Sequence, residues 1–195
     1  MLVSETARKL LEKEKKLTKT TDENGWSPLH YAAYFSTRLN ISVVKVLLEY
    51  DASAAYIAET KKKRTALHFA AIQGHVDVMK EIVSRCPACC EVVDNRGWNA
   101  LHYAVASKSS PVFEECLENI PLLARLGTKK DDKGNTPFHL IAALVRVQMQ
   151  WQRVLLKNGY RGREIRCGLN KRQLSVDDIL EGNCAEIQVI KSSMN

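Results

Sequence analysis

The sequence predicts an all-α fold in which helix–turn–helix units stack into a solenoid. One short sequence phrase occurs four times, and each copy is followed by a second apolar stretch with helical spacing. The alternation of apolar and polar residues that is typical of strands is missing outside the segments that connect the units. The four phrases are SPLHYAA, TALHFAA, NALHYAV and TPFHLIA, and their histidines are His30, His68, His102 and His139. These histidines are spaced by 38, 34 and 37 residues, which is typical of a repeat protein.

The first helix of each unit begins at the polar residue that opens the phrase. Ser, Thr and Asn are common at helix starts, because their side-chain oxygens can accept amide protons that have no partner within the helix. These residues are Ser27, Thr65, Asn99 and Thr136. Pro28 suits the first helical turn, where no amide donor is needed, and Gly74 is placed to end a helix in the left-handed conformation.

The second helix of each unit presents one apolar face. In the second unit, the apolar residues at helical spacing are Val76, Met79, Ile82 and Val83. Such a unit cannot bury its apolar face alone, so neighbouring units must stack. Residues 4–17 look like the second helix of an upstream unit, and residues 174–180 look like a degenerate fifth start with Asp178 at the histidine position.

The repeats divide the chain into four full units between two partial ones. The first segment holds a single helix, the fifth is a divergent repeat, and the last is a degenerate repeat or C-terminal cap. The predicted segments are residues 1–20, 21–60, 61–93, 94–130, 131–168 and 169–195.

The repeated phrases resemble the T-P-L-H-x-A-A-x-x-G-H pattern of ankyrin repeats, whose period is about 33 residues. The longest match is TALHFAAIQGHVDV at residues 65–78, and four matches in register make the resemblance strong. It implies that the repeat histidines form structural hydrogen bonds between turns and neighbouring units. It also implies a non-catalytic scaffold that binds a protein partner through its concave face.

The sequence of the repeats is also similar to that of plant ankyrin proteins of the accelerated-cell-death type. The similar stretches are DENGWSPLHYAAYF and the segment that runs from AYIAETKKKRTALHFAA to EVVDNRG. In that family a cytosolic ankyrin array precedes several transmembrane helices and acts in defence and cell-death signalling. No apolar run here approaches the roughly 18 residues that cross a bilayer, so the family's membrane anchor is not carried over.

Catalysis, metal binding and cofactor binding are not predicted. The sequence holds no Gly-rich phosphate loop, no G-x-S-x-G motif and no H-E-x-x-H motif. The repeat pattern accounts for every histidine, with His75 in the turn between two helices. CPACC at residues 86–90 contains a Cys-x-x-Cys pair, but a structural zinc site needs four ligands, usually with a second close pair. We expect reduced thiols that fill space in a connector.

The turn tips ahead of the first helices are the predicted partner-binding residues. Trp26, Arg64, Trp98 and Asn135 occupy equivalent positions, and the ankyrin resemblance places this tip on the concave side. Trp and Arg are enriched among binding hot spots, although an indole at a tip can instead stiffen the array. Four first-helix residues would assist in binding: Tyr31, Tyr34, Phe69 and Tyr103. Three of these follow a repeat histidine directly, so burial is the alternative for Tyr31, Phe69 and Tyr103.

A basic block carries the whole net charge of +7, since eight basic residues and one acid lie between positions 146 and 172. The basic residues are Arg146, Arg153, Lys157, Arg161, Arg163, Arg166, Lys171 and Arg172. The block is a solvated face, or it attracts an anionic membrane surface or an acidic protein. No nucleic-acid motif accompanies it, so nucleic acid is not an expected partner.

The remaining predictions concern partners and location. The first alternative to a protein-binding scaffold is a peripheral membrane binder that acts through residues 146–172. The second is a truncated relative that pairs with membrane-anchored family members and modulates them. The start MLVSETARKLLEKEKK has no apolar signal-peptide region. We therefore expect the chain in the cytoplasm, or at the cytosolic face of a membrane.

Overall fold

A computed structural model describes residues 2–36, 41–107, 112–145 and 167–181. Within these ranges the protein is all-α, with short 3-10 helices and a single isolated antiparallel bridge between Ala58 and Thr65. The predicted all-α class is therefore confirmed. The chain forms two compact units, Met1–Leu123 and Ala124–Asn195, and each is described by itself.

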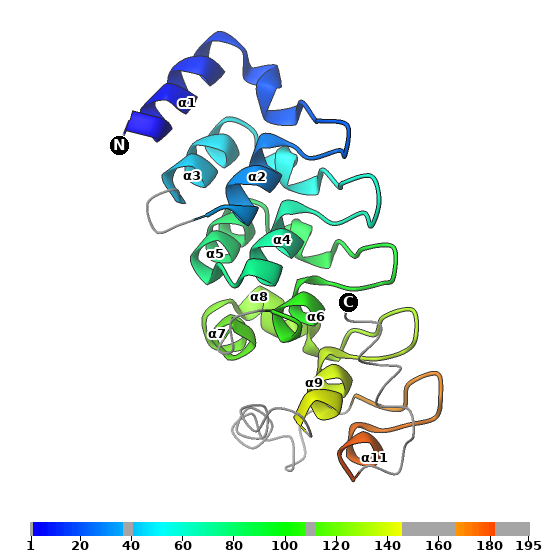
Figure 1. The fold of residues 1–195 in the computed structure, drawn as a ribbon. Coiled ribbons are helices and arrows are strands. Elements are labelled where there is room, and N and C mark those ends of the chain that lie inside the picture. Colours follow the sequence, from blue (N-terminus) through cyan, green and yellow to red (C-terminus); the bar gives the residue numbers. More distant parts are fainter. Residues whose placement is uncertain (1, 37–40, 108–111, 146–166, 182–195) are drawn as a thin grey trace. The chain divides into compact units, whose positions relative to one another are not determined.

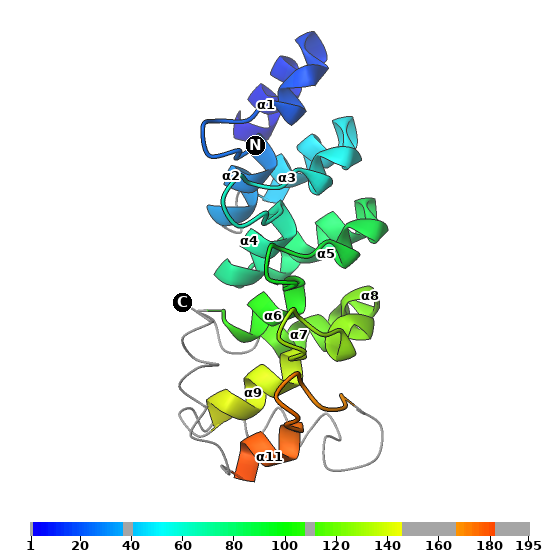
Figure 2. The same cartoon turned by 90° about the vertical axis from the view of Figure 1, so that its right-hand side faces the viewer.

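The helices of the first unit form two rows (Figures 1 and 2). Neighbouring helices within each row pack against one another: α2 against α4 and α4 against α6 in one row, and α1 against α3, α3 against α5 and α5 against α7 in the other. The first row holds α2 (Pro28–Tyr34), α4 (Ala66–Gln73) and α6 (Ala100–Val105). The second row holds α1 (Leu2–Lys13), α3 (Ile41–Tyr50), α5 (Val76–Arg85) and α7 (Val112–Asn119). This arrangement is the predicted stack of helix–turn–helix units.

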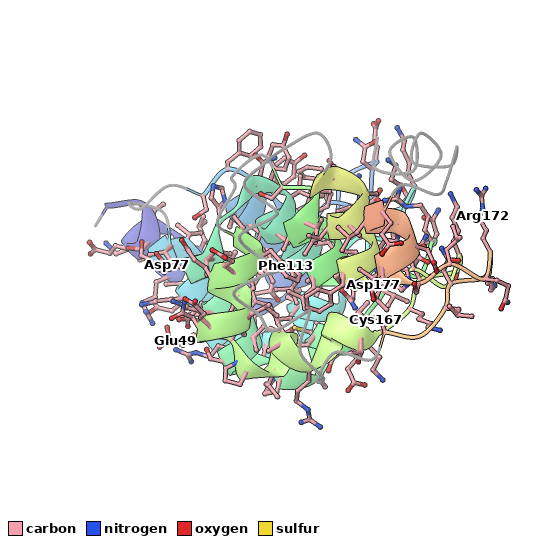
Figure 3. The ribbon with its side chains drawn as sticks, turned by 90° about the horizontal axis from the view of Figure 1, so that it is seen from below. Glu49, Asp77, Phe113, Cys167, Arg172 and Asp177 are labelled. Atoms are coloured by element: carbon pink, nitrogen blue, oxygen red, sulfur yellow. The ribbon has the colours of Figure 1, made fainter. Side chains whose placement is uncertain are left out.

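Small residues allow the helices of the first row to approach closely. Ala33, Ala70 and Ala71 are completely buried. Gly74 ends α4 with φ of +80°, the left-handed conformation that the sequence predicts there. In the view along the stack, the fully buried Phe113 lies inside, whereas Glu49 points outward at the edge (Figure 3).

A 3-10 helix and an extended connector follow α1, α3 and α5. The 3-10 helices are η1 (Lys15–Lys19), η2 (Ala52–Tyr56) and η3 (Pro87–Glu91). The connectors that follow them project away from the two helix rows (Figure 1). Successive connectors are joined by backbone hydrogen bonds, from the Thr60 amide to the Asn24 carbonyl (2.9 Å) and from the Asn95 amide to the Lys62 carbonyl (3.0 Å).

Each connector turns back at a residue with positive φ. Gly25 has φ of +78° and Gly97 has φ of +76°, and Lys63 adopts the same conformation with φ of +59° where the repeat pattern has glycine. A Cβ atom on Gly25 would lie 2.9 Å from the backbone nitrogen of Thr60 in the next connector. Only glycine therefore fits at position 25 without moving the neighbouring connector.

The second unit again contains, among its described residues, a 3-10 helix and the first helices of two repeats. It contains η4 (Arg125–Thr128), which follows α8 (Pro121–Ala124), and the packed helices α9 (Pro137–Val145) and α11 (Val176–Glu181). The predicted fifth helix start is confirmed, because the Asp178 carboxylate accepts bonds from the Ser175 amide (2.8 Å) and hydroxyl (2.6 Å). A repeat histidine makes the same bonds in other units. The segment boundaries given above stay predictions.

Candidate partner-binding site on the first repeat

His30 and His68 hold their helix starts against the following repeat. The Nδ1 atom of His30 accepts from the Ser27 amide (3.1 Å), and its Nε2 atom lies 3.1 Å from the Arg64 carbonyl oxygen. His68 makes the equivalent contacts with the Thr65 amide (3.0 Å) and the Trp98 carbonyl oxygen (3.1 Å). A carbonyl can only accept, so the proton lies on Nε2. These imidazoles are therefore occupied by structural hydrogen bonds.

The capping residues form capping boxes, in which their side chains accept from the backbone amide of the histidine as the sequence predicts. At Ser27 and Thr65, the hydroxyl lies within hydrogen-bond distance of the histidine ring nitrogen, 2.8 and 3.0 Å away. Asn99 behaves as predicted, because its side-chain oxygen accepts from the amides of Leu101 (2.9 Å) and His102 (3.2 Å). At Ser27, Thr65 and Asn99 alike, the histidine ring nitrogen accepts from the backbone amide of the capping residue.

The expected row of exposed turn tips needs correction. Trp98 is only 2% exposed and Tyr103 5%, and Phe69 and Asn135 are also buried. In the third repeat the guanidinium carbon of Arg96 lies over both rings, 4.1 Å from the centre of Trp98 and 5.7 Å from that of Tyr103. For Phe69 and Tyr103, burial was the stated alternative. Asn135 lies in the second unit, where its side-chain oxygen accepts from the Asn170 amide group (2.9 Å).

The first repeat differs from the others because its aromatic side chains are open to solvent. Tyr31 is 44% exposed and Phe35 62%, and Trp26 and Tyr34 are partly exposed. The ring centroids of Trp26 lie 5.1 Å from Tyr31 and 5.4 Å from Tyr34, and the Tyr31 and Phe35 rings are parallel to within 9°. We call these four residues the first-repeat aromatic surface.

Phe35 is the residue of this surface that the sequence analysis missed. Its signal was present, because it follows Tyr31 by four residues and therefore lies on the same helix face. The ring packs edge-on against Tyr34 with centroids 4.8 Å apart, which holds it beside the other aromatic rings.

A pocket of about 460 Å³ opens beside the first-repeat aromatic surface. Its charged and polar lining residues are Asp22, Asn24, Glu59, Lys61 and Arg64. The Tyr31 hydroxyl donates to Asp22 Oδ2 (2.7 Å), and Arg64 Nε donates to Glu59 Oε1 (3.1 Å). The hydrogen bond from Tyr31, aided by the Trp26 and Asn24 amides, lowers the pKa of Asp22 below its usual value. The Asp22 carboxylate is therefore ionised at neutral pH.

The cysteines lie inside the protein. Cys86, Cys89 and Cys90 are buried around η3, and the five cysteines of the described residues are free thiols. Burial raises the pKa of Cys116 to about 12, so this thiol stays protonated. No group of three or more His, Cys, Asp or Glu side chains suited to a metal ion occurs among the described residues.

Most of the basic block lies outside the described residues, namely Arg146, Arg153, Lys157, Arg161, Arg163 and Arg166. Lys171 and Arg172 are described and exposed in the second unit, where Arg172 points outward (Figure 3). The binding role of the block stays a prediction. In the part of the chain that the structure describes, no helix is long and apolar enough to cross a membrane.

Comparison with protein-family models decides the family. A model described as ankyrin repeats (3 copies) matches residues 40–120, and one described as ankyrin repeats (many copies) matches residues 5–48. Together they cover more than half of the chain. This chain is an ankyrin-repeat protein. Its helix rows and projecting connectors are the framework of that family, and the first-repeat aromatic surface lies on this framework.

Curated relatives with known names share part of the array. The AVO2 subunit of target of rapamycin complex 2 from Saccharomyces cerevisiae is 31% identical over 130 residues, which covers 64% of this chain and 28% of that protein. Human ankyrin repeat and SOCS box protein 3 is 29% identical over 172 residues, covering 69% of this chain and 31% of that protein. The bovine protein of the same name is 28% identical. The chain spans less than a third of the length of these relatives.

Proposed function

We propose that this chain is a non-catalytic interaction scaffold that binds a protein partner through the first-repeat aromatic surface. One observation carries the proposal: Tyr31 and Phe35 are 44% and 62% exposed, whereas the residues equivalent to Tyr31 in the next two repeats are buried. Exposed aromatic rings beside a pocket are typical of interaction sites, where aromatic side chains supply much of the binding energy. The ankyrin array supplies the rigid support that such a site needs.

The relatives support a scaffold in general terms. The yeast relative is by name a subunit of a protein complex, which is a role that a non-catalytic interaction array can fill. None of the three relatives reported above is a plant protein of the accelerated-cell-death type. The role in plant defence therefore rests on sequence similarity alone, and the role as a modulator of membrane-anchored relatives rests on analogy with that family. The cytoplasmic location stays a prediction.

The experiment is affinity purification with variants that change one surface patch at a time. Phe35→Ser removes the most exposed ring of the surface, and Leu10→Ser is the matched control because Leu10 is 53% exposed on α1. We expect a reproducible set of proteins to be lost with Phe35→Ser and kept with Leu10→Ser. Equal capture by both variants and the unmodified chain would contradict the proposed surface.

The membrane alternative is tested separately with vesicles that contain anionic lipid. Binding through the basic block should weaken steeply as ionic strength rises, because exposed charges are screened. The aromatic surface should respond much less to salt. Salt-sensitive vesicle binding that survives Phe35→Ser would favour the membrane function.

A further inference from the structure

The third repeat contains a complete binding site for a guanidinium group, filled by its own Arg96. The guanidinium carbon lies 4.1 Å from the centre of the Trp98 ring and 5.7 Å from that of Tyr103. Its Nε atom donates to Asp94 Oδ2 (3.2 Å), and one of its terminal nitrogens donates to the Tyr103 hydroxyl (3.0 Å). Aromatic faces and a carboxylate together satisfy the charge and the planar donors of the group.

The first repeat holds the same frame without the arginine. The Tyr31 hydroxyl donates to Asp22 Oδ2 and the Tyr103 hydroxyl to Asp94 Oδ2, both at 2.7 Å. The two tryptophans match as well, since the amides of Trp26 and Trp98 each donate to the Oδ1 atom of their aspartate at 2.8 Å. The position of Arg96 is taken here by Asn24, a short neutral amide.

In the second repeat a guanidinium also lies over the aromatic residue that follows the histidine, although Arg64 stands at the tryptophan position rather than at the position of Arg96. Phe69 stands at the position of Tyr31, and the guanidinium carbon of Arg64 lies 4.6 Å from the centre of its ring. Arg64 also donates to Glu59 at 3.1 Å. The aromatic residues that follow His68 and His102 are thus each covered by an arginine of the chain. Among the described residues, no arginine covers Tyr31 in this way.

We propose that the pocket beside the first-repeat aromatic surface binds an arginine side chain of the partner protein. This inference rests on the proposed function and names the chemistry that the partner must supply. The pocket volume of about 460 Å³ falls within the range of about 300–1,000 Å³ that is common for ligand sites. The guanidinium stacks on Trp26 and Tyr31 and donates to the Asp22 carboxylate, as Arg96 does in the third repeat.

The other charges around the pocket set its selectivity. Glu59 and Arg64 compensate each other through their ion pair, so Asp22 and Lys61 remain as the lining charges. A lysine of the partner would lack the planar face that stacks on the aromatic rings and the paired donors of a guanidinium. Lys61 repels a cationic ligand and attracts an anionic one. Removal of its charge should therefore strengthen the binding of a cationic ligand and weaken the binding of an anionic ligand.

The test follows the Trp26 indole N–H by nuclear magnetic resonance during titration with three peptides. They are acetyl-Gly-Gly-Arg-Gly-Gly-amide and the same peptide with lysine or with neutral citrulline in place of arginine. We expect saturable binding of the arginine peptide with a dissociation constant on the order of 1 mM, since few contacts are involved. The citrulline peptide should bind at least about tenfold more weakly, because the charge-assisted bond is lost.

Three variants of the full chain sharpen the test. Asn24→Arg should fill the site with the chain's own guanidinium and abolish binding, whereas Leu10→Ser, at an exposed position of α1 that does not line the pocket, should leave binding unchanged. Asp22→Asn keeps an oxygen for the two backbone amides and should weaken binding about tenfold or more. Lys61→Gln should strengthen binding about two- to fivefold at low salt. Circular dichroism and thermal unfolding establish that each variant is folded.

The outcomes separate this inference from the proposed function. It is overturned if the Trp26 signal shows no saturable change at about 10 mM peptide, about ten times the expected dissociation constant. Equal binding of the citrulline peptide, or weaker binding of the arginine peptide after Lys61→Gln, also overturns it. If Phe35→Ser abolishes partner capture and Asn24→Arg does not, the result supports the first-repeat aromatic surface and contradicts the arginine site. If the arginine peptide binds but the Phe35→Ser variant still captures every partner, the result contradicts the proposed function instead.

Discussion

Acidification should destabilise the protein through its buried repeat histidines, and His68 is the residue that tests this. Burial lowers the pKa of His68 from 6.5 to about 4, because the charged imidazolium is disfavoured away from water. The neutral ring accepts from the Thr65 amide and donates to the Trp98 carbonyl oxygen, and these contacts join two repeats. The perturbation is His68→Gln, which removes the titrating group.

The magnitude follows from the difference between the pKa values of the folded and unfolded chain. Between pH 6.5 and pH 4, the unfolded chain binds a proton at position 68 that the folded protein does not. The stabilisation is complete above pH 6.5 and is lost as the pH falls through this window. Within this window the free energy of unfolding falls by about 1.4 kcal/mol per pH unit. Since pH 5.0 lies 1.5 pH units below 6.5, the loss at pH 5.0 is about 2 kcal/mol.

The assay is urea unfolding followed by circular dichroism at pH 7.5 and pH 5.0. The unmodified chain should lose about 2 kcal/mol more free energy of unfolding between these pH values than the His68→Gln variant. Burial also lowers the pKa values of His30 and His139, but their effect is present in both proteins and cancels in the difference. The pKa values of Asp22 and Asp94 are lowered from 3.8, below this window. Equal losses in the two proteins would refute the reasoning.

Three further substitutions test the packing. Phe113→Ala empties a fully buried position and should lower the free energy of unfolding by about 3–5 kcal/mol, and a loss below about 1 kcal/mol would show that the site collapses. Gly25→Ala should cost at least about 1–2 kcal/mol, because φ is +78° and the new Cβ meets the Thr60 nitrogen; an unchanged melting temperature would contradict this. Arg96→Ala should cost about 1–3 kcal/mol and increase acrylamide quenching of Trp98, and unchanged quenching would show that another group covers the indole.

The fold could be predicted from sequence because each helix start is encoded locally. Ser27 and Thr65 begin helices at the predicted positions, and Gly74 ends one in the predicted conformation. The repeated phrase also fixes which helices are neighbours, since equivalent residues of consecutive repeats must stack. The capping arrangement even tolerates a change of chemistry, because Asp178 replaces the repeat histidine and still bonds to the residue before its helix.

The partner surface was harder to predict because exposure depends on side chains from outside the repeated phrase. Trp26 and Trp98 occupy equivalent positions, yet only Trp98 is fully covered. The residues two positions earlier also differ: the first repeat has Asn24, and the third has Arg96, whose guanidinium lies over the Trp98 ring. Neither Asn24 nor Arg96 belongs to the repeated phrase. An alignment of the phrases alone therefore predicts the same exposure for the two tryptophans.

This comparison explains how one array can hold closed and open copies of the same arrangement. The aspartate, the turn and the aromatic residue after the histidine maintain the connector, so they can recur whether or not a ligand is bound. The side chain at the position of Asn24 and Arg96 differs between the two repeats, whereas these framework bonds recur in both. An arginine there covers the aromatic rings and completes the charge balance within the chain. In the first repeat the short neutral Asn24 stands at this position and Tyr31 is 44% exposed, whereas in the second repeat Arg64, at the tryptophan position, covers Phe69.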